Sequence, residues 1–169
     1  EIRLWFDGPL ALSGSMAHGG AVLAARAMGA DFAYVGSAFI ATEEARAAEA
    51  YKQMIVESSS DDIVYSNLFT GVHGNYLRGS ILAAGLDPDA LPHADKTSMS
   101  FGSESKKVWK DVWGAGQGVG TIERVLPVRE LVLELEREYR AARAALAAGA
   151  MSEHVQRAHH RKHGLVAEA

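Results

Sequence analysis

The sequence predicts an α/β fold built from parallel strand–helix units, and two observations support this prediction. Two short apolar runs, residues 9–13 and 32–35, each end at a glycine and each lead into a segment with helical character. Both runs are almost continuously apolar, which is typical of strands that are buried on both faces of a parallel sheet. Strand, helix, strand and helix in close succession is the pattern of βαβ units.

Local signals define the helices of this stretch. An alanine-rich segment, residues 19–28, predicts a short helix, and Gly29 stands where a C-terminal capping glycine belongs. Thr42 is the predicted N-cap of the next helix, with Glu43 and Glu44 in its first turn, where acidic side chains suit the helix dipole.

The rest of the chain is less periodic until its last helix. Residues 75–84 look helical, whereas residues 88–106 are expected to form an ordered loop. Four glycines at alternate positions make a second glycine-dense loop over residues 114–120. Pro127 then opens the strongest predicted helix, residues 127–148, which carries an apolar stripe.

Composition excludes several classes of function. The 169 residues include no cysteine, so there is neither a disulfide framework nor a cysteine-based zinc site. A formal net charge of −4 without a basic, aromatic-studded stripe argues against a nucleic-acid platform. No apolar run reaches 18 residues and no signal-peptide pattern is present, so we expect no membrane partner and a cytoplasmic location.

Two glycine-rich loops follow the two predicted strands and suggest a phosphate site. Ser13-Gly14-Ser15 leads into Gly19-Gly20 and a helix, and Gly36-Ser37 follows the second strand. Backbone N–H groups and a helix N-terminus attract phosphate, and glycine lets the backbone come close to it. The alternative is that the glycines only form tight turns. Two adjacent loops of the same chemistry favour phosphate.

These residues resemble a known family. Residues 8–45 are similar to the end of the flavin barrel in the nitronate monooxygenase family, formerly called 2-nitropropane dioxygenases. In that family a Gly-Gly-hydrophobic-x-x-Gly loop and a Gly-Thr-Arg-Phe-like segment hold the FMN phosphate. The first corresponds to Gly14-Ser15-Met16-Ala17-His18-Gly19 and the second to Gly36-Ser37-Ala38-Phe39. The resemblance thus implies that Gly14, Ser15, Gly36 and Ser37 bind the cofactor, while Ala38 removes the family's arginine.

The resemblance extends to a late segment of the chain. Trp113-Gly114-Ala115-Gly116-Gln117 looks like the Trp-Ser-Ala-Gly-Gln segment that folds back towards the flavin in these proteins, which implies a cofactor contact by Gln117. A dinucleotide-binding fingerprint is a poorer match, because the G-x-G-x-x-G register breaks at Val119 and Thr121. The nucleophile elbow G-x-S-x-G of hydrolases is absent.

The resemblance also implies a domain plan. Residues 1–60 would be the last βα units of a flavin-binding (β/α)8 TIM barrel, residues 61–150 a mostly helical C-terminal extension packed on it, and residues 151–169 a mobile polar tail. Family members are about twice as long, as a complete barrel requires. Their Gly-Gly-His segment with the catalytic histidine would lie before residue 1. The missing N-terminal part of the barrel, on the same or a second chain, is therefore an expected partner, and no catalytic residue is assigned.

The histidines of this chain have less specific interpretations. His18 lies in the first glycine-rich loop, where many polar residues would serve, and His73 lies in a turn-like segment. Four histidines in the tail match no H-E-x-x-H helix, so no metal site is predicted.

Three functions remain open from the sequence. The resemblance favours an FMN-dependent oxidoreductase of the nitronate monooxygenase type, which oxidises a small, acidic carbon substrate and passes electrons to dioxygen. The same framework resembles flavin-dependent enoyl and NAD(P)H:quinone reductases, and a coenzyme A thioester is a conceivable substrate. A phosphosugar barrel enzyme without flavin is the second possibility, and a half-barrel binding subunit is the third. A homo-oligomer is left open.

Overall fold

The computed structural model describes residues 1–93 and 111–149, and internal contacts divide the chain into two compact units. The first unit contains residues Glu1–Leu12, His18–Ala33 and the chain from Val132 onward, whereas the second contains Ser13–Ala17 and Tyr34–Leu131. The predicted mobile tail, residues 151–169, and most of the predicted loop at residues 88–106 lie outside the described residues.

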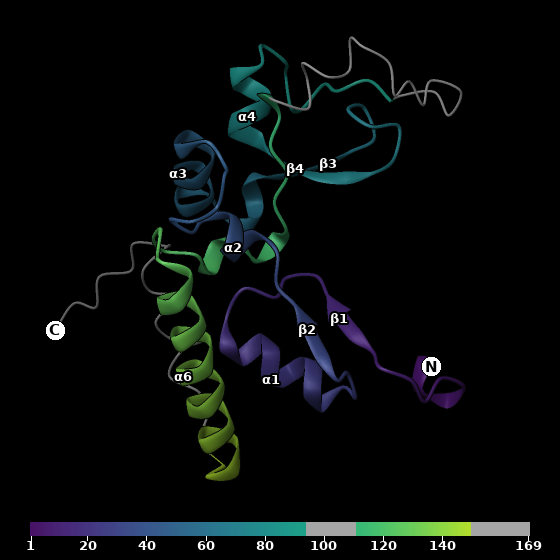
Figure 1. Ribbon diagram of the computed structural model, residues 1–169. Coiled ribbons are helices and arrows are strands. Elements are labelled where there is room, and N and C mark those ends of the chain that lie inside the picture. The colour runs from purple at the N-terminus through teal and green to yellow at the C-terminus, as the bar shows by residue number, and fades with distance from the viewer. Residues whose placement is uncertain (94–110, 150–169) are drawn as a thin grey trace, which may run out of the picture. The chain divides into compact units, whose positions relative to one another are not determined.

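The first unit carries the predicted strand–helix–strand motif (Figure 1). A short 3₁₀ helix, η1 (Ile2–Leu4), precedes strand β1 (Ala11–Ser13), helix α1 (Gly19–Ala27) and strand β2 (Phe32–Tyr34). β1 and β2 are hydrogen-bonded neighbours in a two-stranded sheet. The motif is confirmed, with each strand one or two residues shorter than predicted. The protein is thus mixed α/β.

Helix α1 begins and ends as its local sequence requires. His18 is the N-cap, and its Nδ1 accepts the Ala21 N–H at 3.3 Å. Gly29 has a φ of +92°, in the left-handed region that favours glycine. Beside it, the Ala30 N–H bonds to the Ala25 carbonyl at 3.0 Å. The predicted capping role of Gly29 is therefore confirmed.

Helix α6 (Val128–Ala147) matches the helix predicted for residues 127–148. Its last four turns belong to the first unit, where they pack against the start of α1 at Gly19. A Cβ atom at Gly19 would overlap the Leu135 carbonyl oxygen and the Tyr139 nitrogen, and would lie 2.6 Å from the Glu138 Cβ. Only glycine lets the two helices approach this closely.

The second unit contains the remaining elements. Its 3₁₀ helices are η2 (Ser60–Asp62) and η3 (Gln117–Thr121), and its strands are β3 (Ile63–Ser66) and β4 (Gly74–Leu77). Its helices are α2 (Ser37–Ile40), α3 (Glu49–Glu57) and α4 (Arg78–Ala83), with the first turn of α6. β3 and β4 form an antiparallel hairpin in which Ile63 pairs with Leu77 and Ser66 with Gly74.

The helix predicted for residues 75–84 is wrong in its first part, where the chain forms β4, and α4 begins only at Arg78. Tyr76 pairs with Val64 of β3, and it also forms a bridge with Gly114. Pairing on both sides thus overrides the local helical preference. The segment predicted to be mostly helical therefore contains a β-hairpin.

Thr42 is not the N-cap of a helix, which corrects the prediction for this residue. Its Oγ1 donates to the Phe39 carbonyl at 2.8 Å, and the next helix, α3, starts at Glu49 after Ala48. Glu44 instead accepts the N–H of Val128, the first residue of α6, at 2.9 Å. The acidic side chain does stabilise a helix N-terminus, but that of a helix far along the chain.

The core of the second unit is apolar and is formed by side chains from α3, β4, α4 and η3. Ile55, Leu77, Ile81 and Val119 are fully buried. The ring of Phe69 meets that of Tyr76 edge-on at 4.7 Å between centroids. Val112 belongs to the same apolar cluster, so the segment that begins at residue 111 packs against the hairpin.

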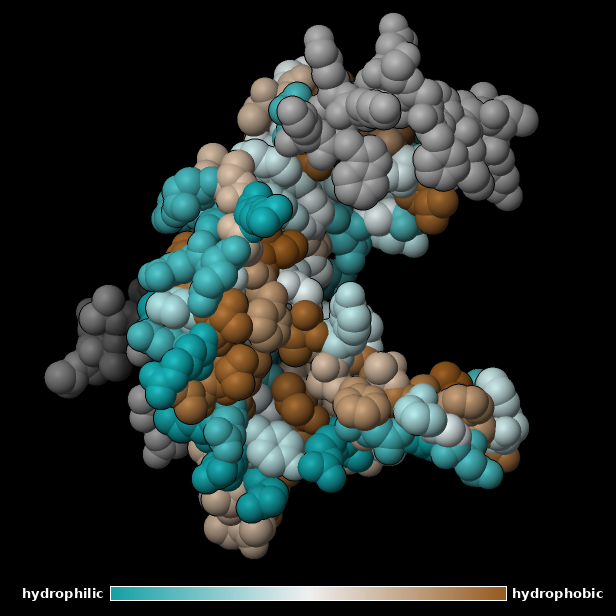
Figure 2. All heavy atoms as spheres, viewed as in Figure 1, coloured by the Kyte–Doolittle hydropathy of each residue, from teal (hydrophilic) through white to brown (hydrophobic). Residues whose placement is uncertain are grey.

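Large apolar side chains also remain on the surface, and Figure 2 shows apolar residues among polar ones on the face drawn. In the first unit, the most exposed include Leu4 at 88%, Trp5 at 74% and Phe32 at 62%. Phe32 lies in β2, so part of the two-stranded sheet presents an apolar residue to the surroundings.

Candidate phosphate-binding pocket

A cavity of about 190 Å³ lies within the second unit. Its lining comes from three separated glycine-containing segments and consists of Ser13, Gly14, Ser15, Met16, Ala17, Tyr34, Gly36, Ser37, Gly116 and Gly118. Sites that enclose a whole small molecule usually have about 300–1,000 Å³. This cavity is therefore of a size to hold one part of a ligand.

The loop after β1 has a backbone conformation that its neighbours hold in place. Gly14 has a φ of +101° and Ser15 one of +52°, and Ser15 is the only non-glycine residue with positive φ among the described residues. Such a conformation is uncommon for a side-chain-bearing residue and carries a small cost. Gly118 packs directly on this turn, because a Cβ there would lie 3.0 Å from the Ser15 Cα.

The loop after β2 is tied to the late glycine segment through a serine. Ser37 Oγ accepts the N–H of Gly116 at 2.8 Å. A hydroxyl can accept and donate at the same time, so the Ser37 hydroxyl hydrogen remains available to a ligand. The three glycine segments are thus joined around one cavity: residues 13–17, residues 36–37 and residues 116–118.

The donors around the cavity are neutral. No charged side chain is among its lining residues. Within residues 1–93 and 111–149, the N–H groups of Ser15 and Gly36 have no protein acceptor. Ala38 is only 2% exposed and does not line the cavity, so this position supplies no cation. The arrangement can bind a small anion through backbone N–H groups and a hydroxyl, without a salt bridge.

The structure brings most of the predicted site residues together. Gly14, Ser15, Gly36 and Ser37 all line the cavity. Gln117 is exposed and is not a lining residue, although its neighbours on both sides are. Their roles in binding remain predictions.

Sequence reasoning missed several residues of the cavity wall, among them Tyr34, Gly116 and Gly118. The glycines at alternate positions of residues 114–120 predicted a loop. They did not indicate that this loop packs closely on Ser15.

The start of α1 differs from the prediction in its chemistry. The Gly19 N–H, which the sequence offered to a phosphate, donates to Glu138 Oε2 of α6 at 2.7 Å. A carboxylate therefore already stabilises this helix N-terminus. Glu138 lies 119 residues away in sequence, so no local pattern could reveal it. His18 acts as the N-cap, in line with the less specific interpretation of its role.

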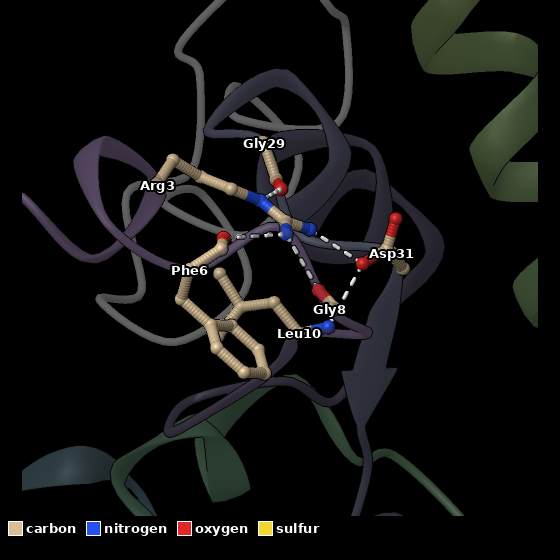
Figure 3. Close-up of polar contacts among 6 residues, drawn as sticks. All are labelled: Arg3, Phe6, Gly8, Leu10, Gly29 and Asp31. Carbon is tan, nitrogen blue, oxygen red and sulfur yellow. Dashed lines mark hydrogen bonds and ion pairs between the residues drawn. The ribbon is translucent and has the colours of Figure 1, made fainter.

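A second polar cluster lies in the first unit and is centred on Arg3 (Figure 3). Its guanidinium donates to the Gly29 carbonyl at 2.8 Å, to the Gly8 carbonyl at 2.7 Å and to Asp31 Oδ2 at 2.5 Å. Asp31 Oδ2 also accepts the Leu10 N–H at 2.8 Å. The Leu10 N–H, and then Arg3, lower the pKa of Asp31 below its usual value. These bonds join protein groups to one another, so the cluster is structural.

Other predicted features can be placed briefly. The His73 ring stacks on that of Tyr65 at 4.8 Å and does not line the cavity. The part of the chain that the structure describes holds no group of three His, Asp or Glu side chains arranged for a metal ion. In the same residues, no helix has the length and apolar character needed to cross a membrane. The four histidines of the tail lie outside the described residues.

The model of one known protein family matches most of this chain. The profile of the family described as nitronate monooxygenase matches residues 6–138. A nitronate monooxygenase of Paraburkholderia phytofirmans is 28% identical over 138 residues, which cover 77% of this chain and 37% of that protein. The chain spans about two fifths of the length of the curated relatives it matches.

Solved structures agree with this relationship at the level of the fold. Nitroalkane oxidase from Streptomyces ansochromogenes is similar with a TM-score of 0.66 and 30% identity, over 86% of this chain and 43% of that one. A mutant of FabK from Thermotoga maritima is similar with a TM-score of 0.67 and 22% identity, over 87% of this chain and 47% of that one. The chain thus matches nearly half of each neighbour.

Proposed function

Because the chain belongs to the nitronate monooxygenase family, we propose that it forms part of an FMN-dependent oxidoreductase and that its pocket holds the FMN phosphate. The observation that carries this proposal is the meeting of three glycine segments around one cavity. The resemblance assigns two of these segments to the phosphate and the third to the flavin.

The chemistry of the donors fits a phosphate group. The N–H groups of Ser15 and Gly36 and the Ser37 hydroxyl can each bond to a phosphate oxygen. Gly14 and Gly118 keep the wall free of side chains where a Cβ would be strained or too close. A cavity of this size would hold the phosphate end of FMN and not the whole molecule. The exposed Gln117 side chain is proposed to contact the cofactor beyond the phosphate.

A bound flavin would supply the redox chemistry, taking electrons from an acidic carbon substrate and passing them to dioxygen. The residues of this chain bind and orient the cofactor by its phosphate. The proposed substrate is a small molecule with an acidic C–H bond, and the proton-accepting group is assigned to no residue here.

We also propose that the pocket belongs to the C-terminal part of a (β/α)8 barrel. In the second half of such barrels, loops after neighbouring strands commonly form a phosphate site. A two-stranded sheet is only part of a barrel, and exposed apolar residues such as Phe32 and Trp5 support further packing partners. Strands corresponding to the rest of the relatives' length, on the same or a second chain, would cover them.

A spectrum of the complete protein tests this proposal. We expect the visible absorbance bands of oxidised flavin, release of FMN on denaturation, and bleaching when a nitronate is added without oxygen. Bleaching by NAD(P)H in place of a nitronate would instead assign a reductase. A protein that is colourless, cannot be reconstituted with FMN and releases a phosphosugar would contradict the proposal.

A further inference from the structure

We propose that Tyr51 is a positioning residue for the phosphate-binding pocket, although it does not line that pocket. This inference rests on the proposed function and concerns how the pocket is held in shape. Tyr51 lies in α3 and acts on residues 113–118, the segment whose glycines form one wall of the cavity.

Tyr51 makes two contacts with this segment. Its hydroxyl donates to the Gly114 carbonyl, and its ring stacks on that of Trp113 at 5.0 Å between centroids, with 16° between the planes. Burial raises the pKa of the Tyr51 phenol, so the hydroxyl keeps its proton at neutral pH and remains a donor.

The other bonds of the segment fix its start against the hairpin. The Trp113 N–H donates to Ser80 Oγ at 2.9 Å, and the Trp113 carbonyl accepts the Leu77 N–H at 2.8 Å. Ser80 is fully buried. Further along, the Ala115 N–H donates to the Asn75 carbonyl at 3.3 Å. Backbone groups of β4 and the Ser80 hydroxyl of α4 thus bond to residues 113–115. Tyr51 of α3 bonds to the same residues through its own hydroxyl.

The end of the segment contacts two residues of the pocket, Ser37 and Ser15. Two residues beyond Gly114, the Gly116 N–H donates to Ser37 Oγ at 2.8 Å. That bond orients the hydroxyl, so that its own hydrogen is left to a ligand. Gly118 then packs on the backbone of Ser15. Loss of the bond from Tyr51 to Gly114 therefore loosens the placement of both Ser37 and Ser15.

The test compares FMN with riboflavin, which has the same ring and ribityl chain but no phosphate. In the complete protein stripped of flavin, Tyr51→Phe keeps the stacking ring and removes only the hydroxyl. We expect the Kd for FMN to rise about five- to tenfold, as the loss of one partly buried hydrogen bond would produce. The Kd for riboflavin should rise by a clearly smaller factor, because riboflavin has no phosphate to bond to Ser37 and Ser15.

Tyr65→Phe is the matched control, because Tyr65 is an exposed tyrosine whose ring contacts His73 and not the segment 113–118. It should change neither Kd. A second comparison uses Ser37→Ala, in which adding Tyr51→Phe should weaken FMN binding by less than it does in the wild type, since both changes act on one hydroxyl.

The outcomes separate this inference from the proposed function. If wild-type protein binds FMN but Tyr51→Phe leaves its Kd unchanged, or weakens FMN and riboflavin equally, Tyr51 does not position the phosphate cradle. Full additivity with Ser37→Ala would overturn the route through Ser37. If wild-type protein binds neither flavin, both the proposed function and the inference fail.

Discussion

The Arg3 cluster and the pocket at Ser15 and Ser37 are both polar groupings around glycines, yet they use their polar groups in opposite ways. Around Arg3, the guanidinium donates to the Asp31 carboxylate and to backbone carbonyls (Figure 3). In the pocket, no lining side chain is charged, and the N–H groups of Ser15 and Gly36 bond to no acceptor among the residues that the structure describes. The more strongly charged grouping supports the fold, and the neutral one is suited to a ligand. Changes in the first should therefore affect stability, and changes in the second should affect binding.

Gly19→Ala should have the largest effect of the changes considered, and the effect should be on stability. Its methyl group would overlap the backbone of α6 at Leu135 and Tyr139, and backbone atoms cannot move aside as a flexible side chain can. We expect a loss of about 3 kcal/mol in the free energy of unfolding, measured by urea denaturation.

Gly20→Ala is the control for this change, because its methyl group would meet only the side chain of His18, at 3.0 Å. The two glycines are adjacent in the first turn of α1, so a general intolerance of side chains there would affect them equally. Equal losses in the two variants would contradict the assignment of Gly19 as a helix-packing residue.

Gly118→Ala should act on binding. Its methyl group would lie 3.0 Å from three backbone atoms of Ser15 and would displace the turn that forms one wall of the pocket. We expect the Kd for FMN to rise about tenfold in a fluorescence titration, with a loss of about 1 kcal/mol in stability.

Gly116→Ala provides the comparison for Gly118→Ala, since its nearest neighbour would be Ser37 Oγ at 3.5 Å, an ordinary contact. It should weaken FMN binding clearly less. If Gly116→Ala is the more damaging of the two, close packing on Ser15 is not what requires glycine at position 118.

Asp31→Asn should make the protein less stable at neutral pH and reduce its sensitivity to acid. The Leu10 N–H and Arg3 hold the pKa of Asp31 below its usual value of 3.8, so the unfolded chain takes up this proton first as the pH falls. The stabilisation by the charged carboxyl is full above that value and is lost as the pH falls through the lower folded-state pKa. The melting temperatures of wild type and variant should thus differ at pH 7 and converge as the pH falls below 3.8.

Asp89 provides an internal comparison, because its hydrogen bonds with Arg78 lower its pKa in the same direction. Asp89→Asn should show the same convergence through a different pair. A difference between wild type and Asp31→Asn that stays constant from pH 7 to pH 3 would contradict the role assigned to the Arg3 cluster.

Ser15→Gly should have the smallest effect. Glycine adopts a φ of +52° without strain but adds freedom to the unfolded chain, and these two terms oppose each other. We expect a change in stability within about 1 kcal/mol and nearly unchanged FMN binding, because glycine keeps the backbone N–H. A large loss of affinity would show that the serine hydroxyl itself contacts the ligand.

The sequence predicts those parts of this protein that depend on local patterns. The strand–helix–strand motif, the capping glycine at 29 and the last helix all follow from neighbouring residues, and the structure confirms them. Features that depend on distant pairing are missed. Tyr76 forms a strand because it pairs with Val64 and Gly114, and Glu44 stabilises a helix that begins 84 residues later.

The candidate site shows the same division. Gly14, Ser15, Gly36 and Ser37 follow predicted strands and could be proposed from the sequence. The contact of Gly118 with Ser15 and the bond from Gly116 to Ser37 join parts of the chain that are about 80 to 100 residues apart. The sequence around Gly19 is compatible with two roles, a phosphate-binding loop and a close contact between helices. Only the positions of Glu138 and α6 in the structure show that it has the second role.

The central claim is that a pocket without charged side chains binds the phosphate of FMN, and titration of flavin-free complete protein with FMN and with riboflavin tests it most directly. Several hydrogen bonds to a charged phosphate should make FMN bind about tenfold or more tightly than riboflavin. Gly118→Ala should reduce that ratio. Equal Kd values for FMN and riboflavin in the wild-type protein would contradict the account.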